Sequence, residues 1–347
     1  MRVREKRAYP SGKIIRIEHC SRILADNPWG DPDQREVAVY LPHDYKPSGN
    51  PLIALWDLAA YTNSGPGHLN WRNQGENLVE RLDRLIAEGR LSSTVVVIPD
   101  CYTYLGGNQY VNSASVGRYA DYLVEELVPL VSEHINVVDS RDGRGLFGKS
   151  SGGYGALFHA INYPETWGAV ASHAGDTGFN LVYPPEFPTV CRVLAGFGGD
   201  VDAFIQSFWR KNRPVGEDYS TMMILAMAAS YDPDPKSPQK IRLPFDLRTC
   251  ELIPERWQNW LSFDPLNMVE KGAVALKSLH GLYIDVGRHD QYNIQFGSRQ
   301  LVDRLKRFGV KHHYEEFDGS HSGIDWRLDH SLPFMVASLK KAINGAI

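Results

Sequence analysis

The segment GRGLFGKSSGGYGALFHAINYP, residues 143–164, determines how the rest of the sequence is interpreted. A short apolar run is followed by two serines among glycines, and then by small residues that can begin a helix. The five residues 148–152, Gly-Lys-Ser-Ser-Gly, fit the G-x-S-x-G pattern of a nucleophile elbow. Such an elbow turns sharply from a strand into a helix, and glycines flank the serine because larger side chains would collide there. We therefore take Ser150 as the candidate nucleophile and expect a helix from about Gly152 to Asn162.

The same segment also fits a second motif. Residues 143–150, GRGLFGKS, match the phosphate-binding pattern G-x-x-x-x-G-K-[ST]. A phosphate loop binds its anion through the backbone N–H groups of a turn between the two glycines, whereas residues 144–147 are expected to form a strand. A plain strand–helix turn without chemistry is the third alternative. Locally these interpretations cannot be separated, so residues further along the chain must distinguish them.

Strands and helices alternate on both sides of this segment. The runs PLIALWDL (51–58) and TVVVIPD (94–100) are short and continuously apolar, which is typical of parallel strands covered on both faces. Segments with helical periodicity lie between and after them, and the alternation resumes at residue 281. Two N-terminal runs alternate apolar and polar residues, as antiparallel strands do. The alternation predicts an α/β fold with a mostly parallel central sheet and helices on both faces.

The segment 176–280 has a different composition. It is rich in proline and tryptophan, it loses the strand–helix alternation, and we expect helices only around 201–211 and 219–230. No linker composition brackets it. We interpret residues 1–347 as a single α/β-hydrolase domain and 176–280 as an inserted cap-like or lid-like subdomain that precedes the acid-bearing strand.

A serine nucleophile needs a histidine base and an acid, which follow it in the order acid, then histidine, in an α/β-hydrolase. His321 lies in EEFDGSHSGIDW, after the last expected strand and before the final helix. The segment LYIDVGRHDQYN offers Asp285 within a strand and Asp290 in the loop that follows it. We select Asp290 because a loop can present its carboxylate. The alternative for Asp290 is a helix N-cap.

With these residues, a carboxylic ester would be cleaved through an acyl-enzyme on Ser150, with His321 as general base and acid and Asp290 orienting it. The oxyanion requires two N–H donors. We expect one from the backbone of Ser151 and the other from the loop after PLIALWD, where we select Ala59.

The combination resembles the esterase D, or putative esterase, family of α/β-hydrolases, which includes S-formylglutathione hydrolases, enterochelin esterases, feruloyl esterases and mycolyltransferase antigens. The similar stretches include GLFGKSSGGYGALFHAINYPETWGAVASHAG, IDVGRHDQYN and DGSHS. The resemblance implies a serine hydrolase with Ser150, Asp290 and His321 as its triad, and no metal or organic cofactor. The chain departs from it where the oxyanion loop lacks an HGGG sequence and where Lys149 precedes the serine.

The substrate pocket is expected beside the segment CYTYLGGNQY (101–110), because ligands of α/β proteins bind at the carboxyl ends of the strands. The candidate substrate-binding residues are Leu58, Tyr102, Tyr104, Gln109, Tyr110 and Trp209. Aromatic packing between the insertion and the sheet is the alternative for the aromatic members of this set.

Composition limits the classes of partner. The 347 residues carry a net charge of −4, which does not indicate a nucleic acid or a membrane as partner. The four cysteines form no CxxC pair, so we expect no zinc site. The charged start of the chain has no apolar run after it, and we expect a cytoplasmic protein. A small-molecule ester is the expected substrate and a homodimer a candidate assembly.

Two other functions remain open from the sequence. An acyltransferase would use the same triad and pass the acyl group to an alcohol instead of water. A non-catalytic binding protein on a hydrolase fold would keep the residues without the reaction.

Overall fold

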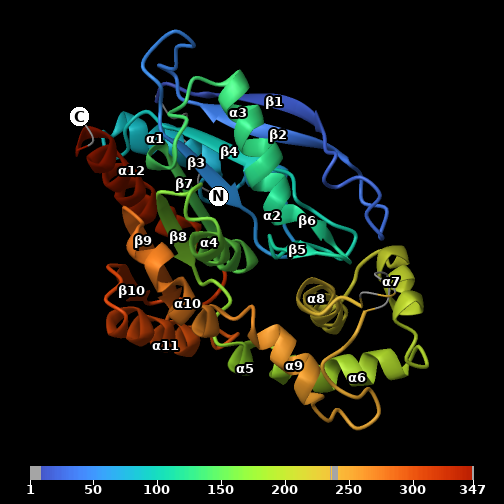
Figure 1. The fold of residues 1–347 in the computed structure, drawn as a ribbon. Helices are drawn as coiled ribbons and strands as arrows, with labels where there is room; N and C mark the ends of the chain where they lie inside the picture. The colour runs from blue at the N-terminus through green and yellow to red at the C-terminus, as the bar shows by residue number, and fades with distance from the viewer. Residues whose placement is uncertain (1–8, 235, 237–240, 346–347) are drawn as a thin grey trace.

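The structure is a computed structural model that describes residues 9–234, 236 and 241–345. The charged start of the chain, residues 1–8, lies outside the described part. An eight-stranded sheet with the strand order β1-β2-β4-β3-β7-β8-β9-β10 forms the centre of the molecule, and helices cover both of its faces (Figure 1).

The sheet is antiparallel at one edge and parallel elsewhere. β1 pairs with β2 and β2 with β4 in antiparallel fashion, whereas all pairs from β4 through β10 are parallel. This confirms the mostly parallel sheet expected from the sequence. The strands of the sheet are β1 (Lys13–Cys20), β2 (Gln34–Leu41), β3 (Ala54–Leu58), β4 (Val95–Pro99), β7 (Arg144–Lys149), β8 (Ala169–His173), β9 (Gly281–Gly287) and β10 (His313–Phe317). A separate two-stranded ribbon is formed by β5 (Asn112–Ser113) and β6 (Gly117–Arg118).

The helices form two covering layers and a further group beyond the sheet. They are α1 (Leu78–Ala87), α2 (Tyr119–Asp121), α3 (Val128–His134), α4 (Ser151–Asn162), α5 (Phe179–Val182), α6 (Phe187–Ala195), α7 (Val201–Arg210), α8 (Gly216–Tyr231), α9 (Pro254–Leu261), α10 (Pro265–Lys277), α11 (Ile294–Arg307) and α12 (Leu328–Gly345). A π-helical turn, Tyr122–Leu127, joins α2 to α3.

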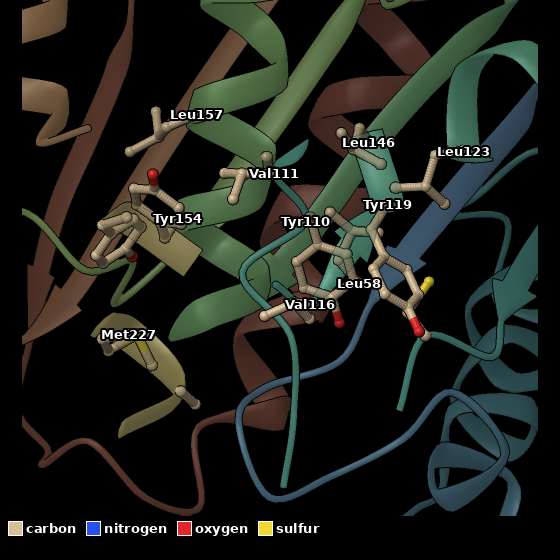
Figure 2. Close-up of a cluster of buried hydrophobic side chains, with 14 of the residues drawn as sticks. Leu58, Tyr110, Val111, Val116, Tyr119, Leu123, Leu146, Tyr154, Leu157 and Met227 are labelled. Atoms are coloured by element: carbon tan, nitrogen blue, oxygen red, sulfur yellow. The ribbon is translucent and has the colours of Figure 1, made fainter. Parts of the chain in front are cut away.

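Side chains on successive strand residues point to opposite faces of the sheet, and each face has its own core. Leu55 and Val96 lie in a cluster with residues of α1 and α12. Trp56 and Val97, their neighbours in sequence, lie in the larger cluster on the other face. Figure 2 shows part of this second core, where Leu146 of β7 and Leu157 of α4 lie among other buried side chains. The continuous apolar runs in the sequence therefore reflect strands that are buried on both faces.

Among the described residues of the segment 176–280 there are six α-helices, α5 to α10, instead of the two expected from the sequence. α6 and α9 both contact α8, and Figure 1 shows α6 to α9 grouped beyond one end of the sheet. α10, by contrast, packs beside the sheet against α4 and α11. Its Gly272 lies so close to Ile161 of α4 that a Cβ would come within 2.5 Å of the isoleucine side chain. The glycine lowers helix propensity, which concealed α10 in the sequence, but it allows this close helix packing.

Candidate active site

Ser150 stands at the turn between β7 and α4. Its backbone has φ 54° and ψ −122°, a conformation that non-glycine residues rarely adopt. Such a conformation costs roughly 1–3 kcal/mol and persists only where the surroundings impose it. The Ser150 N–H donates to the carbonyl of His173 at 2.9 Å, and the Ser150 carbonyl accepts from the N–H of Tyr154 at 2.8 Å. The strand on one side and the helix on the other therefore fix the strained serine.

The two glycines of the motif allow this turn to lie close to β3. A Cβ on Gly148 would lie 2.6 Å from the carbonyl oxygen of Leu58, and one on Gly152 would collide with the same oxygen. Residues Arg144–Lys149 form β7, which is hydrogen-bonded between β3 and β8. The phosphate-loop interpretation is therefore wrong, because the residues that would have to cradle a phosphate are a central strand.

His321 and Asp290 form a buried pair. Nδ1 of His321 lies 2.7 Å from Oδ2 of Asp290, and the two residues are 7% and 2% exposed. The ring of Tyr292 packs edge-on against the imidazole at 4.8 Å between centroids. Asp290 does not cap α11, because that helix begins at Ile294 after Asn293. Its carboxylate instead accepts from the N–H of Tyr292 at 2.9 Å, so the helix-cap alternative does not hold.

Asp285, which was set aside at the sequence level, lies within β9 and is fully buried. Its two carboxylate oxygens bind Nδ1 of His173 and Nε of Arg327, each at 2.7 Å. A third histidine, His68, is hydrogen-bonded to Asp57. Both of these His–Asp pairs lie away from the cavity that contains Ser150.

A cavity of about 410 Å³ lies over the elbow. Ser150, Ser151 and His321 are in its wall, and His321 is its one histidine within the described part of the chain. The elbow and the last loop before α12 thus meet at one cavity, although they are about half the chain apart in sequence. Its other lining residues are Ala60, Tyr61, Thr62, Lys149, Asp176, Val182, Tyr183, Gly216, Tyr219, Ser220, Met223, Tyr292 and Ser322.

Two backbone N–H groups are candidates for an oxyanion hole, those of Ser151 and Ala60. Ser151 is the first residue of α4, and its hydroxyl is occupied because it accepts from the Gln109 amide at 2.6 Å. Ala60 lines the cavity, whereas Ala59 is buried outside its wall and its carbonyl accepts from the Tyr110 hydroxyl at 2.6 Å. No hydrogen bond from the N–H of Ser151 or of Ala60 is found within the described residues. The geometry therefore favours Ala60 over Ala59 as the second donor.

The six substrate-binding residues expected from the sequence lie in the described part of the chain, and none of them lines this cavity. Leu58 and Tyr110 are buried in the core beneath α4, as Figure 2 shows. Gln109 is buried between Ser151 and Tyr231, which donates to its side-chain oxygen at 3.1 Å. These three residues support the elbow from within the protein core and do not line the cavity.

The remaining three aromatic residues join the insertion to the sheet. Tyr104 stacks on Trp209 of α7 at 5.6 Å and on Trp29 at 6.3 Å between ring centroids. The indole N–H of Trp209 donates to the Tyr104 carbonyl at 2.9 Å. Tyr102 is half-buried, and its carbonyl accepts from Arg35. The packing alternative therefore describes Tyr104 and Trp209, whose side chains form contacts between elements.

The sequence analysis missed Asp176 and the aromatic residues around it. Asp176 is the third residue after β8, at the carboxyl end of a central strand beside the nucleophile strand. That position is a signal that could have identified it, since ligands bind at this edge. Burial raises the pKa of Asp176 to about 6, and the nearby His321 opposes this rise. Tyr183 donates to its Oδ2 at 3.0 Å.

Lys149 borders two cavities. A second cavity of about 180 Å³ lies on the other side of the oxyanion loop and shares Ala60 and Lys149 with the first. Burial lowers the pKa of Lys149, while Asp325 and Asp290 act in the opposite direction. Within the described residues, no carboxylate lies within 4 Å of its ammonium, so the charge next to the nucleophile is not neutralised by an ion pair.

The described ranges contain no group of three or more His, Cys, Asp or Glu residues arranged to hold a metal ion. Nor does any helix in these ranges combine the length and the apolar character required to cross a bilayer.

The fold and the cavity define an enzyme of the α/β-hydrolase class, with a serine at a strained elbow. Residues 32–336 match the model of the putative esterase family, and the chain belongs to that family. This confirms the family resemblance, the fold class and the carboxylic ester hydrolase class expected from the sequence.

Several known proteins are similar to this chain. A ferulic acid esterase structure has a TM-score of 0.62 at 18% identity, and the match covers 94% of this chain and 99% of that one. The S-formylglutathione hydrolase of Agrobacterium tumefaciens has a TM-score of 0.57 at 19% identity, covering 98% and 100%. At this identity the structures show a shared fold. A curated relative, the uncharacterized protein YbbA of Bacillus subtilis, is 23% identical over 159 residues, which are 41% of this chain and 56% of YbbA.

Proposed function

We propose that this protein hydrolyses a carboxylic ester through an acyl-enzyme formed on Ser150, with His321 as general base and acid. The observation that carries the proposal is that the one histidine in the wall of the Ser150 cavity is also paired with a buried carboxylate, Asp290, at 2.7 Å. Nucleophile, base and acid follow in the chain order of an α/β-hydrolase.

In the first half of the reaction, Ser150 attacks the ester carbonyl and His321 takes its proton. Asp290 accepts a hydrogen bond from Nδ1–H, which leaves Nε2 unprotonated and able to act as the base. It also stabilises the imidazolium that forms. The carbonyl oxygen gains negative charge in the transition state, and the N–H groups of Ser151 and Ala60 stabilise it there. The imidazolium then gives its proton to the departing alcohol.

In the second half, water attacks the acyl-enzyme while His321 takes its proton; the bond between the acyl carbon and Oγ of Ser150 then breaks, the carboxylic acid leaves, and His321 returns the proton to Ser150. The oxyanion occupies the same place as before, so the same two N–H groups serve both steps. Ser151 contributes through its backbone, because its hydroxyl is held by Gln109.

The segment 176–280 acts as a cap in this proposal. It supplies Asp176, Val182, Tyr183, Tyr219 and Met223 to the cavity wall. The ester would be a small molecule, since a cavity of about 410 Å³ is within the usual range for small-molecule ligands. The homodimer and the cytoplasmic location stay predictions from the sequence.

The proposal is tested with p-nitrophenyl acetate and three proteins: wild type, Ser150→Ala and Ser151→Ala. We expect turnover by the wild type and a loss of at least about 10³-fold in kcat for Ser150→Ala. Ser151→Ala keeps the backbone donor and should lose far less. Equal turnover by wild type and Ser150→Ala would overturn the proposal.

A further inference from the structure

Asp176 is a buried carboxylate in the cavity wall for which the hydrolytic mechanism has no use. It is 6% exposed, yet it lines the same cavity as Ser150 and His321. An acidic side chain at the reacting serine does not help the attack on a carbonyl, since it neither donates to the oxyanion nor contacts Nδ1 of His321. The carboxylate of Asp176 is therefore available to contact the substrate.

Only one of the two oxygens of the Asp176 carboxylate has a hydrogen-bond donor among the described residues. Oδ2 accepts from the Tyr183 hydroxyl at 3.0 Å. Across the described residues, Oδ1 has no hydrogen-bond donor and no Lys, Arg or His nitrogen lies within 4 Å of the group. Asp176 lines the cavity, so a ligand bound there could supply the missing donor and compensate the partial desolvation of the carboxylate.

The hydroxyl groups near Asp176 are held by hydrogen bonds that leave the carboxylate as a hydrogen-bond acceptor for a ligand. The Tyr183 hydroxyl directs its single proton to Asp176, and it lies 3.3 Å from the Tyr231 hydroxyl. Tyr231 in turn donates to Gln109, whose amide holds Ser151. The Tyr183 and Tyr231 protons are therefore both used, toward Asp176 and Gln109, and next to Asp176 the site offers a ligand acceptor capacity.

The charged surroundings are consistent with an ionised group at neutral pH. The titratable groups that act on Asp176 are His321, Tyr183, Asp290 and Asp264, and burial is the largest influence on its pKa, which is raised to about 6. Above that pH the carboxylate is charged and accepts strongly.

We propose that Asp176 binds a hydrogen-bond donor of the ester substrate, an ammonium or a hydroxyl group, and so selects substrates that carry one. This inference rests on the proposed function, since it assigns a substrate class to the same cavity. An ammonium would form an ion pair with Asp176, whereas a hydroxyl would form a charge-assisted hydrogen bond.

The test compares methyl hexanoate, methyl 6-hydroxyhexanoate and methyl 6-aminohexanoate, with kcat/KM measured by pH-stat at pH 8. The readout is kcat/KM for each polar ester divided by kcat/KM for methyl hexanoate, and this ratio is measured for wild type, Asp176→Asn and Asp176→Ala. If an ammonium is the partner, the amino-ester ratio falls roughly 10- to 100-fold in both variants. If a hydroxyl is the partner, Asp176→Asn retains an acceptor oxygen and the hydroxy-ester ratio falls chiefly in Asp176→Ala.

The matched control is Asp202→Asn, which removes one negative charge from an exposed position of α7 in the same insertion. It should leave both ratios unchanged. A second readout needs no variant. In the wild type, the ratio of kcat/KM for the favoured polar ester to that for methyl hexanoate should decline as the pH falls from 8 to 5, because Asp176 becomes protonated. The reaction steps that the three esters share respond to pH in the same way, so their pH dependence cancels in the ratio.

Equal losses on all three esters in both Asp176 variants, with ratios that do not change with pH, would overturn the inference and leave Asp176 a structural residue. That result is distinct from failure of the proposed function, in which the wild type and Ser150→Ala would hydrolyse methyl hexanoate equally.

Discussion

The three residues of the proposed triad, Ser150, His321 and Asp290, lie in environments of different kinds. Ser150 is held in a strained backbone conformation at the cavity, whereas Asp290 is buried behind His321 and receives a backbone N–H from Tyr292. The acid thus has two acceptor bonds that keep it in place and only one of them serves catalysis. Ser150 is the most exposed of the three residues, whereas His321 is 7% exposed and Asp290 is 2% exposed.

Replacing Asp290 by Asn should lower kcat by roughly 10³- to 10⁴-fold, because an amide can donate to Nδ1 and favour the wrong tautomer of His321. Kinetics with p-nitrophenyl acetate would measure the loss. Because the triad acts as a unit, Asp290→Asn added to Ser150→Ala should cause little further loss. Additive losses in the double variant would contradict the assigned roles.

Asp176 should also affect stability, with a defined pH dependence. Its pKa rises from 3.8 to about 6 on folding, so the folded state is favoured below pH 4 and loses that advantage as the pH rises through 6. At pH 8, Asp176→Asn should therefore be more stable than wild type, by up to about 3 kcal/mol. Urea unfolding at pH 4 and pH 8 measures the difference. A variant less stable than wild type at pH 8 would show that the carboxylate is compensated in the folded protein.

At this scale the sequence pointed to residues that the structure brings to one cavity, but it did not predict the other residues of the cavity wall. G-x-S-x-G, a loop histidine and a loop aspartate are positions that the α/β-hydrolase topology constrains, and the structure brings His321 and Ser150 to one cavity. Tyr104 and Trp209 could not be assigned, because an aromatic side chain suits either a pocket or an interface between elements. Only the three-dimensional arrangement shows that these two rings stack on each other.

Among the elements, the insertion packs around aromatic side chains that belong to the larger core on one face of the sheet. Trp260 of α9 is fully buried, and its ring meets those of Tyr183, Tyr231 and Phe187 edge-on within 6.3 Å. Two of these partners, Tyr183 and Tyr231, also belong to the hydrogen-bonded chain that ends at Ser151. The packing of the insertion and the geometry of the elbow are therefore connected.

Trp260→Ala should destabilise the protein by about 3–5 kcal/mol, because it leaves a cavity among packed rings. It should also lower kcat/KM, since Tyr183 lines the catalytic cavity. Trp209→Ala is the matched control: Trp209 lies on α7 of the same insertion and is 40% exposed, so its loss should cost much less. Thermal unfolding and ester kinetics give both quantities. Equal destabilisation by the two variants would contradict the idea that Trp260 forms the centre of the insertion.

Strands and helices could be predicted from the sequence where they are long enough to show a clear apolar pattern. Strands β3, β4, β7, β8 and β9 are buried on both faces, and their apolar runs marked them in the sequence. Four of the six helices between 176 and 280 were missed. α5, α6 and α9 have fewer than ten residues, too short for a clear helical pattern, and α10 carries Gly272 at its contact with α4.

Across the whole molecule, a buried ionic network ties the last strands to the C-terminal helix. Arg327, which is 1% exposed, binds Asp285 of β9, the Tyr283 hydroxyl and Glu315 of β10. Burial alone would raise the pKa of Asp285, but His173 and Arg327 outweigh it and hold the pKa below its usual value. The network joins β8, β9, β10 and the start of α12.

A carboxyl group with a lowered pKa stabilises the fold above its unfolded-state pKa, and this contribution disappears as the pH falls. We therefore expect wild-type stability to decrease below about pH 4. Asp285→Asn should cost roughly 3–5 kcal/mol at pH 7, because it leaves a buried guanidinium without its carboxylate. Glu315→Gln, at the more exposed end of the network, should cost less. Urea unfolding between pH 3 and pH 7 tests both expectations, and equal costs would argue against Asp285 as the centre of the network.

The central claim is that Ser150 carries the acyl group. The most direct measurement is peptide mapping by mass spectrometry after reaction with a fluorophosphonate, and after rapid acid quench with p-nitrophenyl acetate. We predict that both reagents modify Ser150 and that His321→Ala prevents rapid labelling. Modification of Ser151 or another residue, or ester turnover with Ser150 unmodified, would contradict the account.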